Sequence, residues 1–383
     1  MSNSALEHPN MECGPAAYLN WLAAKDKPLL HTEEYPLFTD AHILSEAVHG
    51  PYHFLNTVAV GSEGVRPGVI LRFEWYWEFP HPDFSRTDSD RYHGGTPAEE
   101  LAALASLAMG TRFGAGNSIR EFASGGDPKG RPRAWTGRPI PALIFSNQSP
   151  ILPNVARGEH SLDLLSPLDI LPAISPSDAF SLLRCSRFYQ DAIWIAESAP
   201  DLGWLLFVSA LETAALSWRS QKDSPSARLR VSKPELFEYL SNLSPAAADR
   251  VANEFADSFG ATKNFLDFVI NFRPAEPQER PEWGAIKWSD NSLRGILKTV
   301  YDYRSKALHS GKPFPAPMCE PPYRASHWAS ATERPLGHVS MRGGTWLEKD
   351  VPILLNTFEY ITRETLLNWW RSLKEPRQSG ERT

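Results

Sequence analysis

Residues 297–311 of this 383-residue chain read LKTVYDYRSKALHSG, and they decide how the C-terminal half is expected to fold. Extended back to residue 290, the pattern predicts a helix over 290–309 that stops at "SG" and the prolines beyond it. At 100° per residue, Arg304 falls within about 60° of Leu293 on the apolar stripe, and His309 lies about 140° from Arg304. The helix therefore turns its arginine toward a core and its histidine away from it.

A core-facing arginine needs a partner, because a guanidinium stays charged when it is buried. The stretch WLLFVSALETAALSW, residues 204–218, predicts a buried helix in which Glu212 is the only charged residue. We expect Glu212 and Arg304 to form an ion pair between the two helices. His309 belongs to the last turn, where the partial negative charge of the helix end favours a protonated imidazole suited to proton transfer.

Composition describes a globular protein of two domains, since hydrophobic residues make up 42% and charged residues 22% of a chain longer than one core supports. A formal net charge of -6 excludes nucleic-acid binding through bulk charge. The three cysteines Cys13, Cys185 and Cys319 form no C-x-x-C pair, which indicates a reducing compartment. With no signal peptide or membrane span expected, the predicted location is the cytoplasm.

Hydrophobic periodicity predicts an α+β N-terminal domain over 1–160 and an all-α bundle over 161–383. In the first domain, strands are expected at 52–60, 68–79 and 141–147, with a helix at 96–113 that Thr96 and Glu99 begin as a capping box. The proline-rich residues 148–177 are expected to form an irregular surface connection. Helices are then expected at 177–198, 201–219, 233–243, 245–259, 261–272, 290–309 and 351–373.

Two stretches carry a resemblance to a known family. SALETAAL, residues 209–216, followed later by VYDYRSKALHSG, residues 300–311, resembles the ApeA-like branch of the HEPN superfamily, in which an Arg-x4-6-His motif stands in a "YDxRSxxxHG" setting. The resemblance covers about residues 177–373, and it is looser over 99–113 and 124–135. Ser310 precedes Gly311 where that setting has glycine alone, and Ser305 fills a slot that is often Asn, Asp or His.

The HEPN resemblance implies an all-α bundle and a metal-independent endoribonuclease that acts as a homodimer, with two motifs facing each other. It implies Arg304, His309 and Ser305 as the catalytic residues, with Glu212 in support, and no cofactor. It further implies a role in phage defence or toxin-like RNA cleavage. In that case the N-terminal domain would sense a trigger or a partner.

Two basic stretches are candidates for RNA contacts, because cations grip phosphates and aromatic rings stack on bases. Residues 129–139 include Lys129, Arg131, Arg133 and Trp135 without an acid, and residues 218–233 include Arg228 and Arg230. In each case a solvated loop or linker is the competing interpretation. These stretches are therefore secondary to the arginine–histidine motif.

Two other functions compete with the ribonuclease. A HEPN module can be catalytically silent and serve dimerisation or partner binding. A metal hydrolase is the third hypothesis, because five potential ligands gather in one loop, although no helical or strand spacing makes them converge. These potential ligands are His81, Asp83, Asp88, Asp90 and His93.

Overall fold

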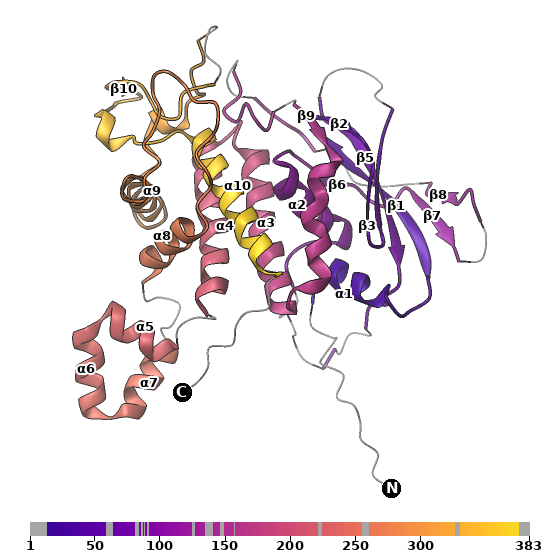
Figure 1. Ribbon diagram of the computed structural model, residues 1–383, viewed down its shortest axis with the longest axis horizontal. Coiled ribbons are helices and arrows are strands. Elements are labelled where there is room, and N and C mark those ends of the chain that lie inside the picture. Colours follow the sequence, from indigo (N-terminus) through magenta and orange to yellow (C-terminus); the bar gives the residue numbers. More distant parts are fainter. Residues whose placement is uncertain are drawn as a thin grey trace. The chain divides into compact units, whose positions relative to one another are not determined.

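The computed structural model describes residues 14–58, 64–80, 84, 85, 87, 89, 92–124, 127–134, 141–145, 149–156, 158–220, 224–254, 260–325 and 330–374 (Figure 1). They divide into two compact units. Unit 1 holds the described residues up to Ser198 and those from Trp369 onward, and unit 2 runs from Ala199 to Asn368. Unit 1 contains the sheet and unit 2 is mainly helical.

Unit 1 is built on a sheet in which every strand pair is antiparallel, in the order β3-β4-β5-β1-β7-β8, with β6 also paired to β1. Along β5, Val69, Leu71, Phe73 and Trp75 are buried and alternate with more exposed neighbours, which confirms the predicted strand up to Trp75. The strand ends there, four residues earlier than expected. A separate parallel pair joins β2 and β9. The strands are β1 (His31–Thr39), β2 (His42–Leu44), β3 (Ala47–His49), β4 (Tyr52–Asn56), β5 (Arg66–Trp75), β6 (Gly114–Ala115), β7 (Arg120–Ala123), β8 (Arg131–Pro132) and β9 (Glu159–Ser161).

Helices α1 (Ala16–Ala23) and α2 (Pro97–Met109) pack together beside this sheet (Figure 1). The predicted capping box is confirmed: Thr96 accepts a hydrogen bond from the backbone of Glu99, whose side chain accepts one from the backbone of Thr96. The helix ends at Gly110, whose φ of 65° suits glycine. Almost every residue of α2 is buried, so it is the central helix of unit 1.

The proline-rich segment is more regular than expected. Residues 162–173 form a 3-10 helix, η1, and Leu162, Leu165, Leu168 and Leu171 are buried. This spacing of three matches the three residues per turn of a 3-10 helix and places the leucines on one face. Because η1 packs on α2, the segment belongs to the core of unit 1, and the division between units falls after Ser198, later than expected. By contrast, residues 141–145 lie in no strand, so the strand expected at 141–147 is wrong over its described part.

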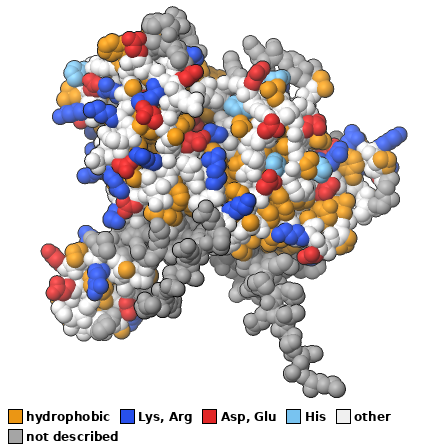
Figure 2. All heavy atoms as spheres, in the orientation of Figure 1, with side chains coloured by type: hydrophobic (Ala, Val, Ile, Leu, Met, Phe, Trp, Pro, Cys, Tyr) orange, Lys and Arg blue, Asp and Glu red, His pale blue; other side chains and the backbone are white. Residues whose placement is uncertain are grey.

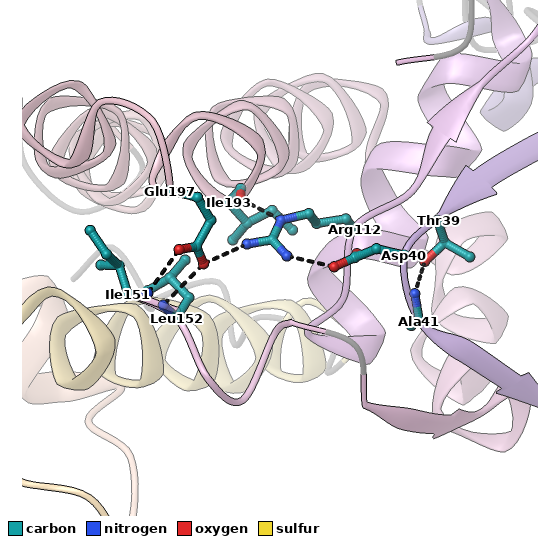
Figure 3. A network of polar contacts seen from close by, with 8 residues as sticks. All are labelled: Thr39, Asp40, Ala41, Arg112, Ile151, Leu152, Ile193 and Glu197. Atoms are coloured by element: carbon teal, nitrogen blue, oxygen red, sulfur yellow. Dashed lines mark hydrogen bonds and ion pairs between the residues drawn. The ribbon is translucent and has the colours of Figure 1, made fainter. Parts of the chain in front are cut away.

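A fully buried arginine joins the parts of unit 1 (Figure 3). Arg112 donates from Nε to the carbonyl of Ile193 at 2.7 Å, near the end of α3 (Pro176–Ile195). Its other nitrogens contact Asp40 and Glu197, each at 3.0 Å. Glu197 also accepts backbone N–H groups from residues 151–152. One cation therefore links the end of β1, the end of α3 and the loop before η1.

Replacing Arg112 with alanine should destabilise unit 1 by about 3–5 kcal/mol, because two buried carboxylates lose their common cation. The loss can be measured as a shift in the urea unfolding midpoint. The matched control is Arg131→Ala: this arginine is 78% exposed and pairs with Asp127, so the change should cost about 1 kcal/mol or less. Equal losses in the two variants would show that Arg112 does not hold unit 1 together.

Unit 2 is formed by helices and short connecting elements, and its core contains Trp204 stacked between Phe314 and Phe358. The predicted helices agree with the structure except at their ends, but α5 was missed within a stretch interpreted as a linker. Within the described ranges, none of the helices combines the length and apolar character needed to cross a bilayer. The elements are α4 (Pro200–Ser220), α5 (Pro225–Ser232), α6 (Pro234–Leu243), α7 (Pro245–Glu254), α8 (Ala261–Asn271), α9 (Asp290–Ser310), η2 (Ala316–Cys319), β10 (Val339–Met341), β11 (Gly344–Trp346), η3 (Glu348–Asp350) and most of α10 (Leu355–Ser372).

Candidate active site

The candidate site is built on α9, which packs on α4 and α8. The side chain of Ser289 caps its first turn, and Gly311 ends it with a φ of 64°, as the sequence predicts. Leu293, Leu297 and Val300 are buried, so the apolar stripe of the helix faces the core of unit 2. Arg304, which continues this stripe, has a side chain only 21% exposed.

The predicted ion pair between Arg304 and Glu212 is confirmed. Arg304 donates from Nη2 to Glu212 Oε2 at 2.6 Å, and the Glu212 side chain is 18% exposed. Neither charge is fully desolvated, so their separation should cost less than the rupture of a deeply buried pair. The contact holds the C-terminal half of α9 against the middle of α4.

Tyr301 completes the cluster around the carboxylate. Its hydroxyl donates to Glu212 Oε1 at 2.8 Å, and the guanidinium of Arg304 lies over its ring, 5.6 Å from the centroid. Burial, followed by the hydrogen bond and charge of Glu212, raises the pKa of Tyr301 to about 12. The phenol therefore stays protonated at neutral pH and keeps donating to Glu212. We did not predict this role, although the i,i+3 spacing of Tyr301 and Arg304 on one helix face was a usable signal.

Arg304 keeps donor capacity beyond this cluster. Its Nε–H is buried and has no hydrogen-bond partner among the described residues. A buried N–H group left without an acceptor is unfavourable, so a small shift that brought an oxygen atom to it would be stabilising. A buried donor left unsatisfied in a native structure calls for an explanation, and a functional role is one such explanation.

His309 is exposed in the last turn of α9, and Ser305, one turn earlier, is half-buried. The structure therefore brings Arg304 together with Glu212 and Tyr301 and leaves His309 on the solvent side. This separation follows the angular divergence that the sequence predicts for the two residues. Any chemistry that needs both side chains at one phosphate has to bridge the inward and outward faces of the helix.

The basic residues of the N-terminal candidate stretch are largely paired with acids. Arg133 contacts Glu33 at 2.6 Å and Glu121 at 3.2 Å, and Arg131 contacts Asp127 at 2.7 Å. Lys129 is exposed, and Trp135 lies outside the described residues. These ion pairs compete with phosphate for both arginines. On the face seen in Figure 2, Lys and Arg side chains are interspersed with Asp and Glu and form no broad basic track.

The second basic stretch contributes Arg230, whose guanidinium lies over the ring of Phe237, 5.1 Å from its centroid. Arg228 belongs to α5, but its side chain lies outside the described residues. The sequence around residues 224–227 contained the missed helix start, because Ser224 caps α5 and Pro225 occupies its first turn. The stretch is thus partly helical.

The candidate metal ligands His81, Asp83, Asp88 and Asp90 lie outside the described residues. The fifth, His93, contacts Glu100 through Nε2 at 2.7 Å. Glu100 also accepts two backbone N–H groups at the start of α1, so its oxygens are already occupied within unit 1. Across the part of the chain that the structure describes, no three His, Cys, Asp or Glu side chains gather as metal ligands would.

Replacing Arg304 with alanine should lower the free energy of unfolding by about 1–3 kcal/mol, because Glu212 then remains partly buried without its cation. His309→Ala should change it by about 0.5 kcal/mol or less, since the side chain is exposed. Arg294→Ala is the matched control on the same helix, because this arginine is 41% exposed and pairs with Asp267. Urea unfolding measures the stability of the three variants. An Arg304 variant as stable as the Arg294 variant would contradict a stabilising role for the Arg304–Glu212 ion pair.

Comparisons with protein-family models, curated proteins and solved structures found no match to this chain. The function of the site is therefore inferred from the arrangement of Glu212, Tyr301, Arg304 and His309.

Proposed function

We propose that this protein is a metal-independent endoribonuclease of HEPN type, and that unit 2 is a HEPN-like bundle. The observation that carries the proposal is the C-terminal half of α9, where Arg304 is fixed by Glu212 at 2.6 Å and His309 is exposed in the last turn. This arrangement agrees with the Arg-x4-6-His resemblance in both residue type and helix position. It provides a positioned cation and a solvent-accessible proton carrier.

RNA cleavage without a metal needs three groups. A base takes the proton from the 2′-OH, an acid protonates the leaving 5′-oxygen, and a cation stabilises the charge on the pentacoordinate phosphorus. The attacking 2′-oxygen forms a new bond to phosphorus as the bond to the 5′-oxygen breaks. The products are a 2′,3′-cyclic phosphate and a free 5′-hydroxyl.

His309 suits either proton-transfer role, because its imidazole is exposed to a substrate. Arg304 suits charge stabilisation, because its planar guanidinium forms short hydrogen bonds to phosphate oxygens. Ser305 offers a hydroxyl one turn before His309 and can donate to a phosphate oxygen. Glu212 and Tyr301 act on Arg304 and do not touch the substrate, so they are positioning residues.

On one α9 helix, Arg304 points inward and His309 points outward. The two side chains of a single copy are therefore badly placed to contact the same phosphate. A twofold axis near the ends of two α9 helices would bring Arg304 of one copy toward His309 of the other. We therefore propose a homodimer with composite sites. Unit 1 would then sense a trigger or partner, in a phage-defence or toxin-like setting.

Purified protein should cleave a structured RNA in the presence of EDTA and leave 2′,3′-cyclic phosphate ends, because the nucleophile belongs to the substrate. DNA of the same sequence should survive, since it lacks the 2′-OH. His309→Ala should reduce cleavage by at least about a hundredfold, the usual contribution of a general acid or base. Gel analysis and mass spectrometry of the ends provide the measurement.

His42→Ala is the matched control, because His42 is an exposed histidine in unit 1 and should leave the rate unchanged. Full activity of His309→Ala would remove the assignment of the nuclease to this motif. A protein that dimerises but cuts no RNA, even with candidate triggers present, would instead be a silent module for dimerisation or partner binding.

Light scattering at micromolar concentration should give twice the monomer mass of 42.8 kDa, because the composite site needs two chains. His309→Ala should preserve this mass, since the substitution removes only an exposed ring. A protein that stays monomeric both alone and with RNA would rule out the composite site.

A further inference from the structure

Unit 2 contains an open cavity of about 700 Å³ that the proposed chemistry does not use. It lies between the first half of α9 and the segments 285–287 and 334–352. Ile286, Ile296 and Pro352 supply apolar lining, and Leu347, 45% exposed, adds to it. Cavities of this size and apolar character are typical of sites for small organic ligands.

The charge around this cavity is predominantly positive. Lys287, Lys349 and Arg334 line it together with one acid, Glu348, which pairs with Arg334. Lys287 and Lys349 are exposed, and neither has a carboxylate partner among the described residues. Two lysines without partners beside an apolar lining favour a ligand with an apolar body and an anionic group.

Hydrogen bonds from residues that do not line the cavity hold its walls in place. Glu333, 6% exposed, accepts the backbone N–H of Ile286 at 2.7 Å and pairs with Arg280 at 2.7 Å. The lining segment that includes η3 is held by the hydroxyl of Tyr303, which donates to the carbonyl of Asp350 at 2.8 Å. The lining is thus anchored before a ligand arrives, which lowers the entropic cost of binding.

We propose that this cavity binds a nucleoside phosphate, with the base between Ile286, Ile296 and Leu347 and the phosphate near Lys287 and Lys349. A flat base fits between aliphatic side chains, and the two lysines supply the charge that the phosphate needs. The site is separate from the catalytic residues, because Ile296 lies about 12 Å along α9 from Arg304 and about 20 Å from His309. The inference goes beyond the proposed ribonuclease activity and does not depend on it.

Isothermal titration of the full chain with AMP, adenosine and inorganic phosphate tests both halves of the proposed ligand. AMP should bind with a Kd below about 1 mM, and adenosine and phosphate should each bind at least about tenfold more weakly. The His309→Ala chain should bind AMP as the wild type does. This result separates the cavity from the proposed catalytic site.

The double variant Lys287→Ala with Lys349→Ala should weaken AMP binding about tenfold and leave the weak adenosine affinity unchanged, because only the phosphate contacts are lost. Leu347→Glu should weaken both ligands, and the half-exposed position should tolerate the change. The matched control is Lys298→Ala with Lys312→Ala, two exposed lysines of unit 2 that do not line the cavity. The proposal is overturned if AMP fails to bind at millimolar concentration or binds equally well to the first double variant.

A nucleoside phosphate can come from a free nucleotide or from a position within an RNA chain. A pentanucleotide with 2′-O-methyl riboses resists cleavage and distinguishes these sources in the same titration. Binding that is tighter than that of AMP and depends on Lys287 and Lys349 would assign the cavity to the RNA chain. Binding that is weaker than that of AMP would assign it to a free nucleotide.

Discussion

Arg304 and Glu212 each bring a full charge to an otherwise apolar helix face, and their 2.6 Å contact constrains how α9 and α4 can pack. Because either charge would be costly alone, the packing that joins them is favoured over other rotations of the two helices. Tyr301 further stabilises this packing, because its hydroxyl donates to Glu212 and its ring lies under the guanidinium of Arg304. With Arg304 fixed inward, the periodicity of the helix leaves His309 on the solvent side.

Unit 1 also contains an arginine paired with a carboxylate between two elements, but there the interaction has a structural purpose. Arg112 is fully buried, and each of its three nitrogens donates to an acceptor within unit 1, namely Asp40, Glu197 or the Ile193 carbonyl, so the guanidinium is closed to a ligand from solvent. Arg304 is partly exposed, and one of its N–H groups has no partner among the described residues. The contrast between the two arginines separates a structural role from a candidate catalytic one on physical grounds.

The sequence predicted those features that arise from local rules. The capping box of α2, the end of α9 at Gly311 and the pairing of Glu212 with Arg304 follow from propensity, periodicity and the cost of a buried charge. Several of the missed features depend on tertiary contacts or on an unusual local pattern. The prolines of η1 hid the three-residue spacing of its four buried leucines. Strand β1 buries consecutive residues, so alternation did not identify it. The acids that pair with Arg133 could not be foreseen either, because Glu33 and Glu121 become its neighbours only when the sheet forms.

Mixing the Arg304→Ala and His309→Ala proteins after joint unfolding and refolding tests the composite ribonuclease site most directly. If each site takes its arginine from one copy and its histidine from the other, every heterodimer contains one intact site. An equal mixture should therefore regain about a quarter of the wild-type RNA cleavage rate, although each variant alone is inactive. Refolded wild type should be active, and mass spectrometry should verify that heterodimers have formed. If the mixture then stays inactive, the composite site is contradicted.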